Sequence, residues 1–383
     1  MQKLLKNLDA LLITNPTNVR YLTCFVGMAE NEREAYCLVT ASGIYLITSP
    51  LYAEYAKNLV LHTKRGSNYP IIQLSNKPIN KTLTKLIASN SVKKLGFEEN
   101  NLIVAEYGKL TKELPGITLV PTQNKVEDLR IIKQDNEIDN IRQAAKLTDE
   151  CFDFILEKLK TCLPAGRQGV TEQEIAWEIE SFIRKNGAQL AFSPIVAFGE
   201  NTSQPHYNPN FTRPRLEIEA PQGEALKDQD IILLDFGSRV NGYCSDMTRV
   251  VFIGQPKDEW RRAFQTVLAA QQTALNRLSH MAYEKNPDGA RGVALDRMAR
   301  GKIEQAGFPD YPHSLGHGVG LDIHEAPRLT MKKDVQLKPG MVVTIEPGVY
   351  IEGQYGVRLE DLVLLKEDCV EVLSRSTKDV VIL

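Results

Sequence analysis

The sequence predicts two domains, an α/β domain of roughly 120 residues followed by a larger mixed α+β domain. Three observations lead to this prediction. Short β-rich runs alternate with helical patterns in the first part of the chain, a short polar segment follows, and long amphipathic patterns then separate isolated apolar strands. With 383 residues the chain is long enough for two or three domains.

Four strands are expected in the first domain, each a short apolar run: Asp9–Asn15, Ala35–Thr40, Gly43–Thr48 and Lys94–Glu98. Three helices are expected where apolar residues recur with helical spacing: Pro50–Val60, Asn80–Ser89 and Ile103–Leu114. The polar segment Pro121–Lys125 is interpreted as a domain boundary, which gives one domain at residues 1–125 and another at 126–383.

The second domain opens with a helical pattern over Val126–Leu159, which predicts one long helix or two helices broken near Thr148. A second helix is expected to begin at Thr171, because Thr followed three residues later by Glu174 is a capping-box signal. Further strands are expected at Ile231–Phe236, Arg249–Ile253, Met341–Glu346 and Leu362–Leu365, and further helices at Asp258–Met281 and Val293–Gly307.

The composition excludes several classes of protein. Lys plus Arg number 46 against 48 Asp plus Glu, so the formal net charge is −2 and no basic field favours nucleic acid. No apolar run approaches the roughly 18 residues of a membrane span, and Asp9 interrupts any secretory signal. The six cysteines are scattered without a CxxC pair, as in a reducing compartment. We therefore expect a cytoplasmic enzyme without nucleic-acid or membrane partners.

Four acidic residues lie in strongly apolar surroundings within the second domain. Asp235 closes the run Ile231–Phe236, and Asp246 follows closely enough for a hairpin to bring the two carboxylates together. Glu346 ends a β-branched run, and Glu360 directly precedes another apolar strand. Because a buried carboxylate without a partner is costly, these residues need a neutralising group.

A metal centre is the simplest neutralising group. His317 adds a nitrogen donor from the glycine-rich segment Ser314–Gly320. Carboxylates with one imidazole suit Mn²⁺ best, with Co²⁺, Fe²⁺ or Zn²⁺ as alternatives, and four negative charges balance two divalent ions. A pair of ions bridged by carboxylates can hold a water or hydroxide nucleophile between them.

Five motifs carry a resemblance to a known family. They are, in order, Leu234–Gly237, Ser245–Arg249, Gly316–Arg328, Ile345–Tyr350 and Gly356–Asp361. Together they closely resemble the pita-bread metallopeptidases of the Xaa-Pro aminopeptidase and Xaa-Pro dipeptidase (prolidase) type. Asp9–Leu22 is similar to the start of the creatinase-like N-terminal domain of that family. The resemblance implies an α/β creatinase-like N-terminal domain joined to an α+β pita-bread catalytic domain.

The resemblance also implies five metal ligands: Asp235, Asp246, His317, Glu346 and Glu360. Asp246 and Glu360 would bridge both ions, Asp235 would bind one ion, and His317 and Glu346 would bind the other. A hydroxide bridging the ions would be the nucleophile, and Glu346 would act as the proton shuttle.

On the substrate side, the resemblance points to His206, His324 and Arg328. His324 would stabilise the tetrahedral oxyanion, and His206 the same intermediate or the scissile carbonyl. Arg328 would bind the substrate's C-terminal carboxylate in a bidentate manner. Arg358 is expected to orient a ligand carboxylate, and related enzymes suggest a homodimer.

The expected activity is hydrolysis of the Xaa-Pro bond at the N-terminus of peptides or in dipeptides, with a proline-containing peptide as substrate. The choice between aminopeptidase and dipeptidase stays open. Alternatives are a methionine aminopeptidase-like or other N-terminal exopeptidase, and a non-catalytic pseudo-peptidase that binds peptides. The segments Cys162–Thr171 and Glu284–Gly292 are longer than the family pattern and are expected to form surface loops. The interval between His206 and Asp235 is also longer than the family pattern.

Overall fold

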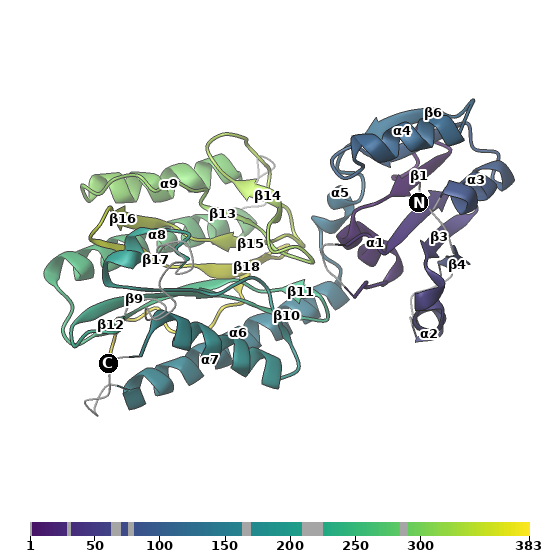
Figure 1. Cartoon of the computed structure of the whole chain (residues 1–383). Coiled ribbons are helices and arrows are strands. Elements are labelled where there is room, and N and C mark those ends of the chain that lie inside the picture. Colours follow the sequence, from purple (N-terminus) through teal and green to yellow (C-terminus); the bar gives the residue numbers. More distant parts are fainter. Residues whose placement is uncertain are drawn as a thin grey trace. The chain divides into compact units, whose positions relative to one another are not determined.

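The computed structural model describes residues 2–28, 32–62, 70–75, 80–162, 170–208, 225–283 and 290–383. The chain divides into two compact units, Met1–Leu129 and Arg130–Leu383 (Figure 1). Residues 163–169 and 284–289, which make up most of the two segments expected to be surface loops, lie outside the described residues, as do residues 209–224 of the long interval between His206 and Asp235.

The first unit is built on a six-stranded mixed sheet with the order β4-β3-β2-β1-β5-β6. Its strands are β1 (Ala10–Ile13), β2 (Ala35–Thr40), β3 (Gly43–Thr48), β4 (Ile71–Leu74), β5 (Lys94–Glu98) and β6 (Thr118–Thr122). Its helices are α1 (Pro16–Thr23), the 3₁₀ turn η1 (Pro50–Tyr52), α2 (Ala53–His62), α3 (Asn80–Ser89) and α4 (Val104–Glu113). The short helix α5 (Glu127–Arg130) follows at the end of this unit.

Side chains alternate across the central strand of this sheet and form two cores. Leu11 and Ile13 pack with residues of α1 and α2, whereas Ala10 and Leu12 pack with residues of α3 and α4. The predicted α/β layers are therefore confirmed. Helix α1 and the two edge strands, β4 and β6, were not predicted from the sequence. Pro121 lies in β6, and proline is tolerated at an edge because its missing N–H is not needed there.

The second unit packs helices on both sides of several small sheets. The two largest of these sheets are the four-stranded sheet β20-β12-β9-β8 and the five-stranded sheet β14-β13-β15-β18-β19. The strands are β7 (Gln189–Leu190), β8 (Ile195–Phe198), β9 (Asp230–Phe236), β10 (Ser238–Val240), β11 (Tyr243–Cys244), β12 (Met247–Ile253), β13 (Gly316–Gly318), β14 (Glu325–Leu329), β15 (Val342–Ile345), β16 (Gly348–Ile351), β17 (Tyr355–Arg358), β18 (Asp361–Leu365), β19 (Val370–Val372) and β20 (Val381–Ile382).

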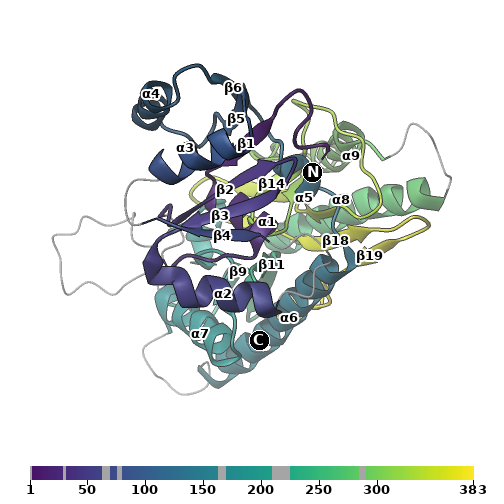
Figure 2. The same ribbon diagram turned by 90° about the vertical axis from the view of Figure 1, so that its right-hand side faces the viewer.

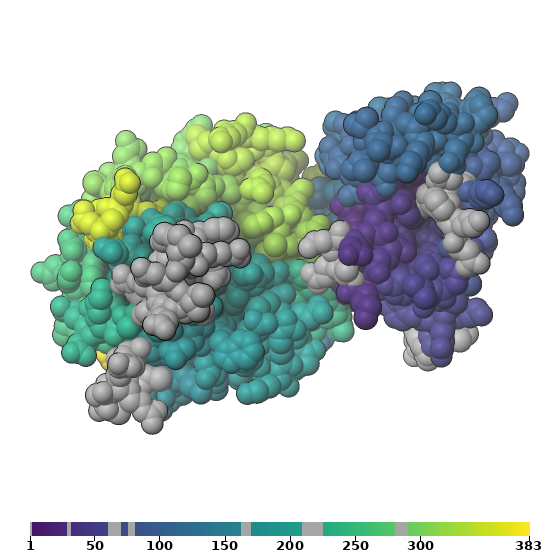
Figure 3. Space-filling model, in the orientation of Figure 1, coloured from purple at the N-terminus to yellow at the C-terminus, as the bar shows by residue number. Residues whose placement is uncertain are grey.

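Four long helices cover these sheets: α6 (Asp135–Cys162), α7 (Glu172–Lys185), α8 (Asp258–Tyr283) and α9 (Gly292–Gln305). Helices α6 and α7 lie side by side on one face, as Figures 1 and 2 show from two directions, and α8 and α9 cover the opposite side. In the space-filling view each unit is a continuous body of packed atoms, purple to blue for the first and teal to yellow for the second (Figure 3).

Strand β9 is buried on both faces, which explains its unbroken apolar sequence. Ile232 and Leu234 pack with α6 and α7, whereas Ile231 packs with α8. Asp235 continues the face of Ile231, because side chains alternate along a strand. This carboxylate therefore points to the side of β9 that faces away from α6 and α7.

The long helical pattern after residue 126 is interrupted earlier than expected. Helix α5 ends at Arg130, and α6 runs without a break from Asp135 to Cys162. A break near Thr148 was therefore wrong: the Thr148 hydroxyl instead accepts a hydrogen bond from the Ser238 backbone N–H at 3.0 Å, which ties α6 to β10. The chain leaves helical geometry at 131–134, where the Lys133 N–H donates to the Gly340 carbonyl at 2.8 Å.

The predicted start of α7 is confirmed. The Thr171 hydroxyl accepts the Glu174 N–H at 3.2 Å, and the Glu174 carboxylate accepts the Thr171 N–H at 2.8 Å, which is a complete capping box. Among the helices that the structure describes, none combines the length and apolar character that a membrane crossing requires.

Candidate metal centre

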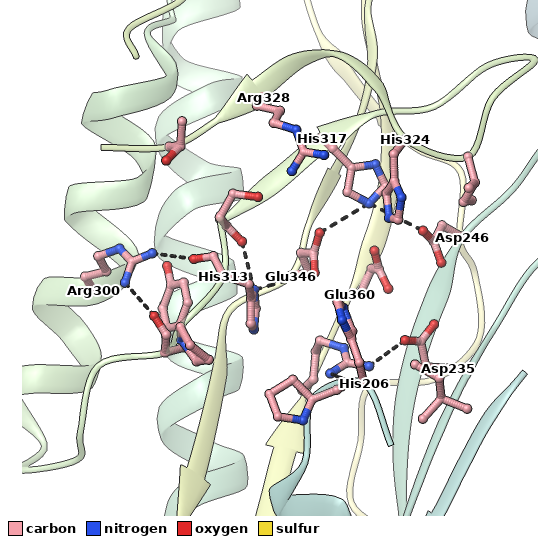
Figure 4. Close-up of a pocket in the computed structure, with 18 of the residues that line it drawn as sticks. His206, Asp235, Asp246, Arg300, His313, His317, His324, Arg328, Glu346 and Glu360 are labelled. Carbon is pink, nitrogen blue, oxygen red and sulfur yellow. Dashed lines mark hydrogen bonds and ion pairs between the residues drawn. The ribbon is translucent and has the colours of Figure 1, made fainter. Parts of the chain in front are cut away.

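A cavity of about 1260 Å³ opens in the second unit between the sheets and the segment that precedes β13 (Figure 4). All eight site residues predicted from the sequence line it: His206, Asp235, Asp246, His317, His324, Arg328, Glu346 and Glu360. They come from separate segments of the chain, so the fold alone brings them together.

The predicted hairpin between the two aspartates is confirmed. Strands β9 and β12 pair antiparallel, with Thr248 opposite Asp235, and the short pair β10–β11 connects them. Asp246 lies directly before β12, so its carboxylate enters the same cavity as that of Asp235. A β-bridge between Thr248 and Glu360 adds the third carboxylate to this side of the cavity.

The hydroxyl of Thr344 connects two further candidate ligands. It accepts the His317 backbone N–H at 3.0 Å and donates to Glu346 Oε1 at 3.1 Å. This contact requires β13 and β15 to approach closely. The approach is possible only with glycine at position 316, because a Cβ there would lie 1.9 Å from the Thr344 carbonyl oxygen. Gly316 therefore serves the packing of β13 against β15.

The imidazole of His317 is held in the form that binds a cation. Its Nδ1 lies 3.1 Å from the Gly318 carbonyl, which can only accept, so Nδ1 carries the proton and Nε2 presents a lone pair. Nε2 lies 3.6 Å from Asp246 Oδ2 and 3.4 Å from Glu346 Oε1 (Figure 4). Burial, together with the neighbouring His324, lowers the pKa of His317 to about 3, so the ring is neutral at physiological pH.

The carboxylates are buried beyond what the protein alone can neutralise. Asp235 and Asp246 each carry one buried oxygen without a hydrogen-bond partner among the described residues. Burial and the adjoining acids raise the pKa of Asp246 and of Glu360 well above their ordinary values, and burial raises that of Glu346 to about 8. A divalent cation would reverse these shifts by supplying the missing positive charge.

Three of the five predicted ligands already meet the geometry of a metal site. Asp246, His317 and Glu360 each offer one donor atom, and these atoms lie within 4.8 Å of one another. Glu346 lies beside His317 (Figure 4). Asp235 lies on β9, which pairs with the strand β12 that follows Asp246. The donor set and the unpartnered oxygens therefore fit a divalent cation.

Arg358 contacts the carboxylate of Asp235, one of the candidate ligands. Its Nη2 lies 2.5 Å from Asp235 Oδ2, and its Nε donates to the Thr248 hydroxyl at 3.1 Å. That hydroxyl in turn donates to Glu360 Oε2 at 2.7 Å. One guanidinium thus fixes two of the candidate ligands, directly for Asp235 and through Thr248 for Glu360.

The sequence did not predict a role for His313, which lines the cavity, or for Tyr350, which contacts it. His313 Nδ1 lies 3.7 Å from Glu346 Oε2, and its Nε2 lies 3.0 Å from the Tyr350 hydroxyl. The same hydroxyl accepts from Arg358 Nη1 at 2.9 Å. Burial and the Arg358 charge lower the pKa of His313 to about 3. A second histidine four residues before His317 was a visible signal, but its spacing did not reveal which way the ring points.

The substrate-side residues lie around this cluster. The ring of His324 meets that of His317 edge-on, with centroids 4.4 Å apart. Arg328 stands opposite His317 in the β13–β14 ladder and is exposed to the cavity. No ion pair between described residues occupies its guanidinium. His206 is also exposed at the cavity wall, on the segment that follows η2 (Gly199–Ser203).

Comparison with known families agrees with this fold. Residues 139–367 match metallopeptidase family M24, and residues 4–132 match the creatinase/prolidase N-terminal domain. The chain therefore belongs to metallopeptidase family M24, with a creatinase-like N-terminal domain and a pita-bread catalytic domain. The predicted fold class is confirmed, and the family implies divalent metal ions and a peptide substrate.

Individual relatives cover nearly the whole chain. An uncharacterized peptidase of Bacillus subtilis, YqhT, is 34% identical over 98% of this chain and 96% of its own. The solved Xaa-Pro dipeptidase from Bacillus anthracis is 33% identical, with a TM-score of 0.85 over 100% of this chain and 98% of its own. The X-Pro aminopeptidase from Thermotoga maritima MSB8 is 29% identical, with a TM-score of 0.82 over 98% of both chains.

Proposed function

We propose that this protein hydrolyses the bond between an N-terminal residue and proline, using two divalent metal ions. The observation that carries the proposal is the convergence of Asp235, Asp246, His317, Glu346 and Glu360 on one cavity wall. The likeness to solved Xaa-Pro dipeptidase and X-Pro aminopeptidase structures supports the choice of substrate.

Four carboxylates and one neutral imidazole favour two hard or borderline ions, with Mn²⁺ preferred over Co²⁺, Fe²⁺ and Zn²⁺. Asp246 and Glu360 are proposed to bind both ions, Asp235 would bind one of them, and His317 and Glu346 would bind the other. When bound, the ions would supply an activated water nucleophile and polarise the scissile carbonyl.

Glu346 is the proposed proton shuttle. Its side chain is 14% exposed, against 6% for Asp246 and 11% for Asp235, so it is the most accessible of these three carboxylates to a substrate in the cavity. A carboxylate that is accessible from the cavity can take a proton from water and deliver it to the departing proline nitrogen. His324 and His206 are proposed to hold the scissile carbonyl oxygen as negative charge develops on it.

Arg328 is proposed to bind the C-terminal carboxylate of a dipeptide. It is exposed at the cavity wall opposite His317, and its planar guanidinium can donate two parallel hydrogen bonds to a carboxylate. This favours dipeptides such as Ala-Pro, whose carboxylate lies close to the scissile bond. A tripeptide would place its carboxylate farther from this guanidinium.

Three further assignments complete the proposal. We place the functional boundary at residues 125 and 126, with catalysis in 126–383. The protein is proposed to act in the cytoplasm, in keeping with the free thiols of Cys24, Cys37, Cys151, Cys244 and Cys369. It is proposed to form a homodimer, which sedimentation of the purified protein would test.

The decisive experiment measures hydrolysis of Ala-Pro, Ala-Pro-Ala and Ala-Ala by protein stripped of metal and then supplied with Mn²⁺ or Co²⁺. Metal-dependent cleavage of Ala-Pro, with Ala-Ala left intact, is expected. Additional cleavage of Ala-Pro-Ala would make the enzyme an aminopeptidase with an open cleft.

The control variant is Asp246→Asn, which keeps the shape of the side chain but removes the anionic ligand. It is expected to abolish turnover and to lower the bound metal while the circular dichroism spectrum stays unchanged. Full activity of this variant would contradict the two-metal proposal, and metal-loaded protein that cleaves neither proline peptide would contradict the substrate assignment.

A further inference from the structure

An ion-pair network lies behind the loop that carries His324. Arg130 Nη2 lies 2.7 Å from Asp322 Oδ2 and 2.5 Å from Glu325 Oε2. Lys133 Nζ lies 2.6 Å from Glu325 Oε1. Two cations from the first residues of the second unit therefore hold the two carboxylates that flank His324 in the sequence.

Three of the four members of this network are buried, unlike those of an ordinary surface ion pair, whereas the Asp322 side chain is 42% exposed. The side chains of Lys133, Arg130 and Glu325 are 1%, 4% and 8% exposed, respectively. Exposed pairs contribute little because water and salt compete for both charges, whereas removing one member of a buried pair leaves an uncompensated charge. The ion pairs of Glu325 with Arg130 and Lys133 therefore keep the Glu325 carboxylate in one position.

The network acts at the point where the loop returns to its sheet. In the β13–β14 ladder, His317 pairs with Arg328, but the register then shifts so that Gly318 pairs with Glu325. Residues 319–324 leave the ladder between these two points. The position of His324 therefore depends on where Glu325 is held.

We propose that Arg130 and Lys133 are positioning residues for the reaction. Through Asp322 and Glu325 they fix the loop so that the ring of His324 stays edge-on against His317. The inference rests on the proposed function, in which His324 acts on the developing oxyanion. Displacing a reacting group by about 1 Å can lower the rate on the order of 100-fold. Loss of these ion pairs is therefore expected to lower kcat.

The first test replaces Lys133 by Met, which fills a similar volume without charge. In the metal-loaded, full-length enzyme, Lys133→Met is expected to lower kcat for Ala-Pro by about 10- to 100-fold, with KM changed by less than about 3-fold and bound metal unchanged. Glu325→Gln removes the shared acceptor charge and is the second variant if Lys133→Met does not fold.

Arg142→Met is the matched control. Arg142 lies on α6 and pairs with Glu371 at 2.7 Å, away from the cavity lining, so this variant also removes a cation but should leave kcat unchanged. An unchanged kcat in both Lys133→Met and Glu325→Gln would overturn the proposal.

A double-mutant cycle with His324→Gln separates positioning from general destabilisation. If Lys133 acts through His324, Lys133→Met should cost less than about 2-fold when His324 is already replaced. Additive losses would overturn the inference while leaving the proposed function intact. A His324→Gln variant with full activity would overturn it as well, because its catalytic premise would be wrong.

The ring signals of the six histidines in an NMR spectrum give a readout that does not depend on activity. Lys133→Met should shift or broaden the His324 signal and leave that of His313 in place. An unchanged His324 signal would overturn the positioning role. If the wild-type enzyme cleaves no proline peptide, the proposed function fails, and this measurement decides the positioning of His324 on its own.

Discussion

Arg328 presents its guanidinium to the cavity from β14, opposite His317, a proposed metal ligand, in the ladder. Arg328→Ala should raise KM for Ala-Pro by about 10- to 100-fold, since hydrogen bonds to a charged group contribute ~1.5–3 kcal/mol. KM for Ala-Pro-Ala should rise less, because the carboxylate of a tripeptide lies farther away. Initial-rate kinetics on both peptides test this prediction.

Arg328→Lys is the control, since it keeps the positive charge but loses the planar fork. It should restore part of the affinity for Ala-Pro and leave the remainder lost. Equal changes in KM for the dipeptide and the tripeptide in Arg328→Ala would remove its role in carboxylate recognition.

At the residue scale, sequence and structure differ in what each can reveal. Acidic residues such as Asp235 and Glu346 could be predicted as site residues, because burying a carboxylate within an apolar strand is costly unless a partner neutralises it. Lys133 was not visible, because a lysine near the start of a helical pattern normally faces solvent. Its partner Glu325 is remote in sequence, so only the folded chain shows that this lysine is buried.

At the scale of single elements, the capping box of α7 offers a clean stability test. Thr171→Ala removes the hydroxyl that accepts the Glu174 N–H, and it should lower the free energy of unfolding by about 1 kcal/mol. Thr171→Ser, which keeps the hydroxyl, should lie within a few tenths of a kcal/mol of the wild type. Urea unfolding measures both values.

Helix α7 does not supply a cavity-lining residue, so kcat for Ala-Pro should be the same in Thr171→Ala, Thr171→Ser and the wild type. A Thr171→Ala protein as stable as the wild type would show that the cap contributes nothing. A lower kcat would show instead that α7 is coupled to the site.

Elements with strong local signals were predictable, and those set by tertiary contacts were not. Strands β2, β3 and β5 match the predicted bounds because their apolar runs are clear. The break between α5 and α6 escaped prediction, because it depends on the contact of Lys133 with Gly340, which is remote in sequence. Edge strand β4 is too short and too exposed to have a distinct pattern.

At the scale of the whole molecule, the metal-free protein should lose stability as the pH rises from about 6.5 to 8. Glu346, with a folded pKa of about 8, and the raised carboxyls of Asp246 and Glu360 keep protons that the unfolded chain has released. The folded state then binds more protons than the unfolded state, so stability falls with pH. His313 and His317, whose pKa values are lowered to about 3, act in the opposite direction only below about pH 6.5.

Thermal unfolding in a chelator, followed at pH 6.5, 7.25 and 8, measures this trend. Saturating Mn²⁺ should abolish it, and the rise in melting temperature on adding Mn²⁺ should be larger at pH 8 than at pH 6.5, because the ion competes with protons for the same oxygens. A metal-free melting temperature that rises between pH 6.5 and 8 would contradict the assignment of these carboxyls.

The candidate ligands are spread along the chain from Asp235 on β9 to Glu360 just before β18. While the protein is being synthesised, the ribosome exposes Asp235 and Asp246 long before the last carboxylate emerges. A nascent chain would therefore hold only part of the proposed site, and metal loading would wait until Glu360 has left the ribosome. Ion capture would then mark a finished catalytic domain, and a chain truncated before residue 360 should compete poorly for metal in the cell.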